Sequence, residues 1–168
     1  MSRPVTDFSG ASLYLDTMIL YALLRALDPA VQHLFARIEA GELLAHTSVL
    51  TFDELTYRML LALIQDHYGR SPLERLRREE AKMIGEFYPP LAPHLARLRA
   101  FPNLRLVDVM ASDLAIMDDT ILQYHLRPRD ALHLAAMQRC DCFDLVSHDS
   151  DFDRVPMISR YTLAARLS

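Results

Sequence analysis

The amino-acid sequence predicts an α/β domain in which helices cover both faces of a mostly parallel sheet. The chain has 168 residues, a length typical of one domain. Its composition, 51% hydrophobic and 24% charged, is that of a folded globular protein and excludes intrinsic disorder. Short apolar runs alternate along the chain with longer helical patterns, and parallel strands need such helical crossovers. We therefore interpret residues 1–168 as a single domain.

The first half of the chain alternates strands with amphipathic helices. We expect, in order, a strand over 13–15, helices over 19–26 and 29–39, a strand over 43–47 and a helix that begins at Thr51. Pro29 suits the first turn of the second helix, and Gly41 suits its end. The run Thr51-Phe52-Asp53-Glu54 matches a capping box, which predicts the start of the third helix.

The second half repeats this alternation after a charged helical insertion. We expect a helix over 71–86, a short helix that ends near 100, a strand over 104–109, helices over 112–125 and 129–140, and strands over 144–147 and 155–158. Pro89, Pro90 and Pro93 are expected to break the helical pattern, because proline removes a backbone donor and clashes with the preceding turn.

The segment 65–100 is predicted to be an arginine-rich helical elaboration of the domain. Its basic residues are Arg70, Arg75, Arg77, Arg78, Lys82, Arg97 and Arg99. Glu74, Glu79 and Glu80 lie among them, so the pattern favours a solvated face that is laced with ion pairs. A surface that guides RNA or contacts a partner protein is the alternative interpretation.

Composition and charge exclude several function classes. The net charge of −4, from 18 basic and 22 acidic residues, argues against a polyanionic partner when the chain is taken as a whole. The four glycines lie too far apart to form a glycine-rich phosphate loop. The longest apolar run has seven residues and the amino terminus lacks a signal-peptide pattern, so we predict a cytoplasmic protein without a membrane segment. Cys140 and Cys142 fit a reducing compartment, and their spacing does not suit zinc.

Acidic residues follow the predicted strands at the edge where open α/β sheets bind ligands. Asp16 ends the first strand, Glu54 lies in the first turn after the second, Asp130 opens the helix before the fourth, and Asp149 and Asp151 follow the fourth. Each acid alone could be a helix cap or a loop residue. Together they would repel one another unless a cation joins them.

Carboxylate oxygens are the ligands that Mg²⁺ and Mn²⁺ prefer, and these ions support phosphodiester hydrolysis. Setting the five acids aside leaves 17 acidic against 18 basic residues, so the acidic balance does not by itself exclude RNA. Arg127 and Arg129, immediately before Asp130, are candidates to hold a substrate phosphate, with simple exposure as the alternative.

Four segments of the chain carry a resemblance to a known family. They are Leu15-Asp16-Thr17-Met18-Ile19-Leu20, the stretch from Thr47 to Leu55, Arg129-Asp130-Ala131-Leu132-His133-Leu134-Ala135-Ala136, and Val146-Ser147-His148-Asp149-Ser150-Asp151-Phe152. In order and spacing, over residues 13–158, they resemble the four motifs of PIN-domain ribonucleases. The third and fourth segments are the more specific.

The resemblance implies a three-layer α/β/α sandwich and a Mg²⁺- or Mn²⁺-dependent endoribonuclease that hydrolyses single-stranded or structured RNA. Many members are toxins of VapC-type toxin–antitoxin pairs, so it also implies a cognate antitoxin protein and a homodimer. Matched motif by motif, the acidic cluster of catalytic and metal-binding residues is Asp16, Glu54, Asp130 and Asp149, and Asp151 is an auxiliary metal-binding acid. Ser147 takes the place of the small hydroxyl residue that orients nearby groups.

One departure from the family pattern leaves an alternative function open. Met18 stands where the family usually has a polar asparagine, so a catalytically impaired module that binds RNA or protein is the second hypothesis. A phosphatase with Asp16 as nucleophile is disfavoured, because Met18 replaces the second aspartate and Lys82 is the only lysine. A Ser147-His148-Asp149 relay is excluded, because consecutive strand residues point to opposite faces. His133, one turn after Asp130, is interpreted as a packed residue.

Overall fold

Six parallel strands form the central sheet of the computed structural model, which describes residues 2–163. The strands are β1 (Arg3–Pro4), β2 (Ser12–Leu15), β3 (Leu44–Ser48), β4 (Leu104–Val107), β5 (Asp144–Val146) and β6 (Ser159–Thr162). Their order across the sheet is β1-β6-β5-β2-β3-β4, and every neighbouring pair runs parallel. The predicted mostly parallel α/β fold is therefore confirmed.

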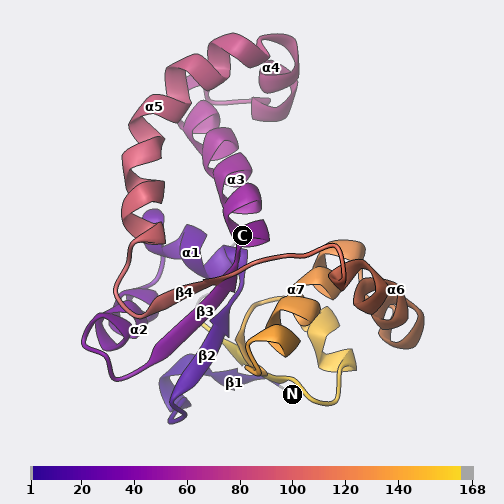
Figure 1. Ribbon diagram of the computed structural model, residues 1–168. Helices are drawn as coiled ribbons and strands as arrows, with labels where there is room; N and C mark the ends of the chain where they lie inside the picture. Colours follow the sequence, from indigo (N-terminus) through magenta and orange to yellow (C-terminus); the bar gives the residue numbers. More distant parts are fainter. Residues whose placement is uncertain (1, 164–168) are drawn as a thin grey trace.

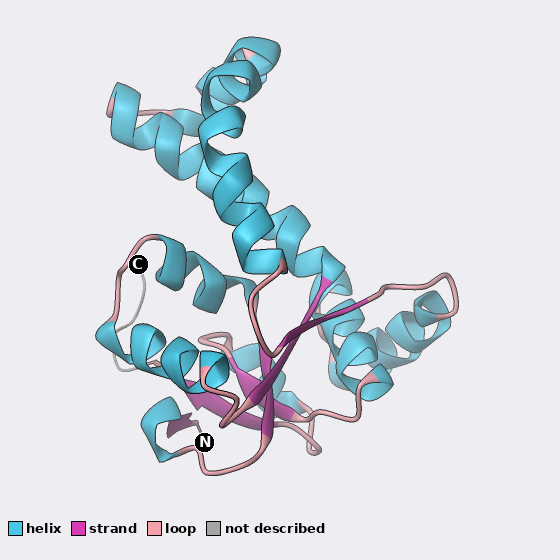
Figure 2. Cartoon of the chain, turned by 60° about the vertical axis from the view of Figure 1, so that its left-hand side comes forward, coloured by secondary structure: helices cyan, strands magenta, loops and turns pink. Residues whose placement is uncertain are grey.

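Helices cover both faces of this sheet (Figures 1 and 2). The helices are α1 (Thr17–Leu24), α2 (Pro29–Glu39), α3 (Val49–Tyr68), α4 (Pro72–Arg78), α5 (Glu80–Arg99), α6 (Asp113–Tyr124) and α7 (Pro128–Arg139), with two short 3₁₀ helices, η1 (Val5–Asp7) and η2 (Ser150–Arg154). Side chains of β2 alternate between two cores, as a pleated strand requires. Leu13 and Leu15 join the core under α1, α2, α3 and α5, whereas Tyr14 joins the core under α7.

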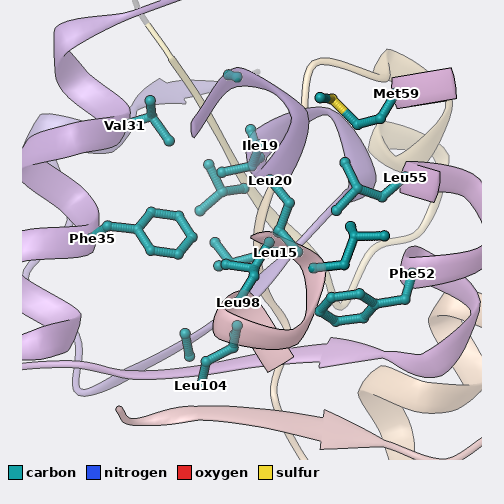
Figure 3. Close-up of a cluster of buried hydrophobic side chains, with 14 of the residues drawn as sticks. Leu15, Ile19, Leu20, Val31, Phe35, Phe52, Leu55, Met59, Leu98 and Leu104 are labelled. Carbon is teal, nitrogen blue, oxygen red and sulfur yellow. The ribbon is translucent and has the colours of Figure 1, made fainter. Parts of the chain in front are cut away.

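The first of these cores fixes the ends of the elements that lead into the acidic edge. In Figure 3, Leu15 of β2 lies among Ile19 and Leu20 of α1, with Phe52 and Leu55 of α3 close by. All five side chains are buried, and burying one such side chain stabilises the fold by about 2 kcal/mol. Because these residues are packed together, the start of α1 and the first turn of α3 are held next to each other, and the Thr17 hydroxyl donates a hydrogen bond to Glu54 at 2.6 Å.

Helices α3, α4 and α5 extend away from the sheet as an arm (Figure 1). The predicted break at Pro89, Pro90 and Pro93 is wrong, because α5 continues through all three prolines. Met83, Phe87, Leu91, Leu95 and Leu98 form one buried stripe along its whole length. The burial of this stripe offsets the proline penalty, which is about 3 kcal/mol in a helix interior.

Ion pairs along the arm involve the charged residues at its tip. Arg75 and Lys82 both contact Glu79, at 3.5 and 2.9 Å, and Arg78 lies 3.5 Å from Glu74. This arrangement is the solvated, ion-paired face that the mixed charge pattern favours.

Other element boundaries also differ from the sequence prediction. Helix α3 begins at Val49, two residues before the predicted start, because the Ser48 hydroxyl accepts a hydrogen bond from the Thr51 backbone at 3.3 Å and caps the helix. The last strand lies at 159–162 rather than 155–158, because backbone bonds from Val155 to Phe152 and from Ile158 to Val155 make turns there. The short edge strand β1 was not predicted. Among residues 2–163, no helix combines the length and apolar character needed to cross a membrane.

Candidate active site

A cleft of about 470 Å³ opens at the carboxyl ends of the central strands. Its lining consists of Asp16, Thr17, Met18, Glu54, Arg58, Arg127, Pro128, Arg129, Asp130, His148 and Asp149. Four of the predicted acids therefore share one cleft, although they come from four separate parts of the chain. Because β2, β3 and β5 are adjacent and parallel, their carboxyl ends meet at this edge.

Ser147 connects two of these acids. Its hydroxyl donates to Asp16 Oδ2 at 2.5 Å and accepts a hydrogen bond from the Asp149 backbone at 3.0 Å. Asp16 Oδ1 also accepts from the Thr17 backbone at 2.6 Å, so both of its oxygens are engaged. The Ser147 side chain, fully buried, thus orients Asp16 and the start of the loop that holds Asp149.

Arg160 supports Ser147 from behind the sheet edge, a role that sequence reasoning missed. Its guanidinium donates to the Ser147 carbonyl oxygen at 3.1 Å and to both carboxylate oxygens of Asp153 at 2.8 Å. Only 8% of Arg160 is exposed. A buried arginine in a short strand is unusual. The sequence prediction ended the final strand at residue 158, so it did not place Arg160 in a strand.

Glu54 is held by groups from two other elements. Its Oε2 accepts from the Thr17 hydroxyl at 2.6 Å, and its Oε1 accepts from Arg129 at 3.0 Å. His133 Nε2 lies 3.8 Å from Oε2. Burial acts to raise the pKa of Glu54, but His133, the Thr17 hydrogen bond and the Arg129 charge outweigh it and lower the pKa to about 2. Glu54 is therefore a stable anion.

Asp130, Asp149 and Asp151 form a cluster of carboxylates close enough to share one metal ion. One oxygen from each lies within 4.8 Å of the other two. Asp149 Oδ1 accepts from the Asp151 backbone at 2.8 Å, and Asp151 Oδ1 accepts from Arg154 at 2.7 Å. Asp16 and Glu54 line the same cleft without joining this group.

Asp130 has the environment of a cation ligand. Its Oδ2 is buried and has no hydrogen-bond partner in the described part of the chain. Burial and the charge of nearby Asp149 raise the pKa of Asp130 to about 6. A divalent cation would remove both penalties, since it would supply a partner for the buried oxygen and offset the repulsion between carboxylates. The residues at this cluster therefore fit Mg²⁺ or Mn²⁺.

The arginines that line the cleft differ in how many contacts they make with carboxylates. Arg129 donates to Glu54 and also lies 3.4 Å from Asp53, while Arg127 is largely exposed and lies 3.8 Å from Asp151. Arg58 lines the cleft too, yet it forms no hydrogen bond or ion pair within residues 2–163. Sequence reasoning missed Arg58, although its position one helical turn after Glu54 was a usable signal.

His133 is buried beside the acids and hydrogen-bonded on one side. Its Nδ1 lies 3.0 Å from the Tyr14 hydroxyl and 3.5 Å from the Ser48 hydroxyl, and 3% of the residue is exposed. It is a packed residue that contacts the Glu54 side of the cleft. Met18, which the motif comparison placed at the position of the usual asparagine, lines the cleft next to Asp16 and Thr17.

The sequence matches the PIN domain family over residues 13–157. No curated protein sequence matches the chain.

Three solved structures illustrate the likeness in fold. A Mycobacterium tuberculosis structure described as VapC20, a sarcin–ricin loop cleaving toxin, is 17% identical, with a TM-score of 0.55 over 86% of this chain and 95% of that one. VapBC2 from Rickettsia felis, bound to a promoter DNA fragment, is 14% identical, with a TM-score of 0.52 over 90% and 98%. A toxin–antitoxin complex from Klebsiella pneumoniae is 18% identical, with a TM-score of 0.51 over 89% and 95%.

Proposed function

Because the chain belongs to the PIN-domain family, we propose that it is a Mg²⁺- or Mn²⁺-dependent endoribonuclease that hydrolyses phosphodiester bonds in single-stranded or structured RNA. One observation carries this proposal. Four acids from separate segments line one cleft, and the buried Oδ2 of Asp130 has no partner within residues 2–163. A site of this composition suits a hard divalent cation, which PIN-type chemistry requires.

The proposal assigns a role to each side chain of the cleft. Asp130, Asp149 and Asp151 would hold the ion, and Asp16 and Glu54 complete the acidic set around it. When bound, the ion supplies positive charge that activates water and stabilises the leaving oxygen. Ser147 keeps Asp16 and Asp149 in place through its two hydrogen bonds.

Arg127 and Arg129 are proposed to contact phosphates of the RNA strand beside the acids. Both lie at the rim of the cleft, and both are more than half exposed. A guanidinium forms two parallel hydrogen bonds to a phosphate, which fixes the strand as well as attracting it. Arg129 would have to share its donors between Glu54 and the substrate, so Arg127 is the freer of the two.

We further propose that the protein is the toxin of a toxin–antitoxin pair, that it acts as a homodimer in the cytoplasm, and that a cognate antitoxin protein binds it. The support is the likeness in fold to VapC20, to VapBC2 and to the Klebsiella complex. Expression of the wild-type chain should then arrest growth, and Asp130→Asn should not. Co-expression of the protein encoded by the adjacent reading frame should relieve the arrest and yield a complex.

Met18 favours a second candidate, a PIN-like module that binds RNA or protein with impaired catalysis. Its thioether lines the cleft beside Asp16 and cannot supply the hydrogen bonds of an amide. Metal-dependent turnover by the purified protein would exclude this candidate.

The decisive experiment measures cleavage of a labelled RNA with Mg²⁺, with Mn²⁺ and with a chelator. Asp16→Asn and Asp130→Asn should each abolish cleavage while circular dichroism shows a folded protein. Asp119→Asn is the matched control, because Asp119 is an exposed carboxylate of α6 outside the cleft, and it should leave the rate unchanged. Cleavage that survives both cleft substitutions would overturn the proposal.

A further inference from the structure

Arg58 lies between two neighbouring hollows. It lines the acidic cleft, and together with Met18 it also lines a second hollow of about 500 Å³. Because they share these two lining residues, the two hollows lie side by side. Arg58 is therefore placed to contact a ligand that extends from the acidic cleft toward the second hollow.

The second hollow has a different chemistry from the first. Apart from Arg58, it is lined by Met18 and Tyr21 of α1, by Leu61, Ala62 and Gln65 of α3, and by Pro72 of α4. Within the described residues 2–163, no carboxylate lines it. The aromatic ring of Tyr21 and the polarisable thioether of Met18 can pack against an aromatic base, and Gln65 adds an amide that can both donate and accept.

The free state of Arg58 distinguishes it from the other cleft arginines. Arg129 is bound to acids and Arg127 lies near Asp151, whereas Arg58 is exposed and has no partner in residues 2–163. A guanidinium in this state offers all its donors to an incoming anion. An anion-binding group beside an apolar hollow of this size fits a nucleotide, which has a phosphate next to an aromatic base.

We propose that Arg58 binds the RNA phosphate next to the one that is cleaved, and that the adjoining hollow receives the base attached to it. This assignment rests on the proposed ribonuclease function, and it names the part of the substrate that the site selects. Met18 then has a role as a wall of the base subsite. The arm contributes through the middle of α3 and through Pro72, rather than through the charged residues at its tip.

The test compares Arg58→Ala and Arg58→Lys with a matched control, Arg97→Ala, on a short RNA with one cleavage site. Arg97 is an exposed arginine of α5 that lines neither hollow. Arg58→Ala should raise KM about tenfold or more with little change in kcat, because it removes a charge-assisted contact outside the reacting group. Arg58→Lys should recover part of the loss, and Arg97→Ala should match the wild type.

The base subsite is tested by replacing single nucleotides of the same RNA with abasic ones. An abasic nucleotide at one position beside the cleaved bond should raise KM for the wild type. The same replacement should have a smaller effect on Arg58→Ala, because the base binds in the hollow only when Arg58 holds its phosphate. If Arg58→Ala behaves like Arg97→Ala, or if no abasic position next to the cleaved bond matters, the subsite assignment is wrong while the ribonuclease function stands.

A wild-type protein that does not cleave would refute the proposed function and still leave the subsite testable. Binding of the same fluorescent RNA is then measured by anisotropy in the presence of Mg²⁺. Weaker binding by Arg58→Ala than by Arg97→Ala would support the subsite in a binding module. Equal binding by the wild type and both variants would overturn it.

Discussion

Ser147 donates its hydroxyl hydrogen bond to Asp16, a residue that lies 131 positions earlier in the chain. The same oxygen accepts from the Asp149 backbone, so one buried hydroxyl spans β2 and the loop after β5. Because hydrogen bonds to charged groups contribute more than neutral ones, this contact stabilises the acidic edge as well as orienting it.

Ser147→Ala is therefore expected to weaken both stability and activity. The variant leaves the Asp149 backbone donor and one Asp16 oxygen without their partner, at a cost of about 1–3 kcal/mol in the free energy of unfolding. Urea denaturation measures this cost, and RNA cleavage measures the loss of orientation. Ser112→Ala is the control, because Ser112 makes no side-chain cap bond at the start of α6. Equal behaviour of the two variants would contradict the orienting role of Ser147.

Thr17→Val should raise the pKa of Glu54 from its value of about 2. The substitution keeps the shape of the buried side chain and removes the hydroxyl that donates to Glu54 Oε2 at 2.6 Å. A depressed carboxylate pKa stabilises the folded state above the unfolded pKa, and that stability is lost as the pH falls toward the folded pKa. Thr17→Val should therefore be less stable than the wild type at neutral pH, and the two should converge in acid.

Carbon-detected NMR titration of the Glu54 carboxyl measures this change directly. Thr56→Val is the control, since the Thr56 hydroxyl donates to the Phe52 carbonyl within the same helix and does not contact Glu54. An unchanged Glu54 pKa in Thr17→Val would mean that the Thr17 hydroxyl does not hold the carboxylate.

Asp130→Asn should stabilise the metal-free protein at neutral pH. The folded pKa of Asp130, about 6, lies above its ordinary value, so the ionised carboxylate destabilises the folded state above pH 6 and this penalty disappears as the pH falls below about 4. With a chelator present, the variant should melt a few degrees above the wild type at pH 7.5, and the difference should shrink toward pH 4.

Added Mg²⁺ separates this electrostatic penalty from a change in packing. A ligand that binds only the folded state raises its melting temperature, so Mg²⁺ should stabilise the wild type more than Asp130→Asn. If Asp130→Asn melts below the wild type at pH 7.5 in chelator, the ionised Asp130 carboxylate does not destabilise the folded state.

Arg160→Met should destabilise the fold. It removes a buried guanidinium, and it leaves the buried Ser147 carbonyl without its donor and the exposed Asp153 carboxylate without its partner. The loss of the buried hydrogen bond to Ser147 dominates and costs about 1–3 kcal/mol in the free energy of unfolding. Arg105→Met serves as the control, because Arg105 is exposed and forms no ion pair among residues 2–163. Both variants are compared by thermal melting. If Arg160→Met and Arg105→Met lowered the melting temperature by the same small amount, Arg160 would not be a support of the site.

The sequence predicted those parts of the site that follow from topology. Asp16, Glu54, Asp130 and Asp149 could be expected at one edge because each lies at the end of a parallel strand or in the first turn of a helix that begins there. The contact between Thr17 and Glu54 could not be assigned, since it depends on how α1 packs against α3 rather than on spacing within either helix.

Predictions from short stretches of sequence were also wrong where packing between distant residues outweighs local preferences. Pro89, Pro90 and Pro93 lie inside α5, because the buried stripe on both sides of them holds the helix together. Arg160 escaped notice because the final strand was placed four residues too early. In both places the missing information was the identity of distant packing partners, which no short window of sequence contains.

The strand order has a consequence for protein synthesis. Strand β5 lies between β2 and β6, and β1, which precedes the other strands in the chain, pairs with β6, which follows them. Asp149 and Asp151 follow β5, so a nascent chain in which this segment has not yet left the ribosome has only part of the acidic set. A cell that makes this protein therefore meets the assembled site only after the segment from β5 to β6 has been synthesised.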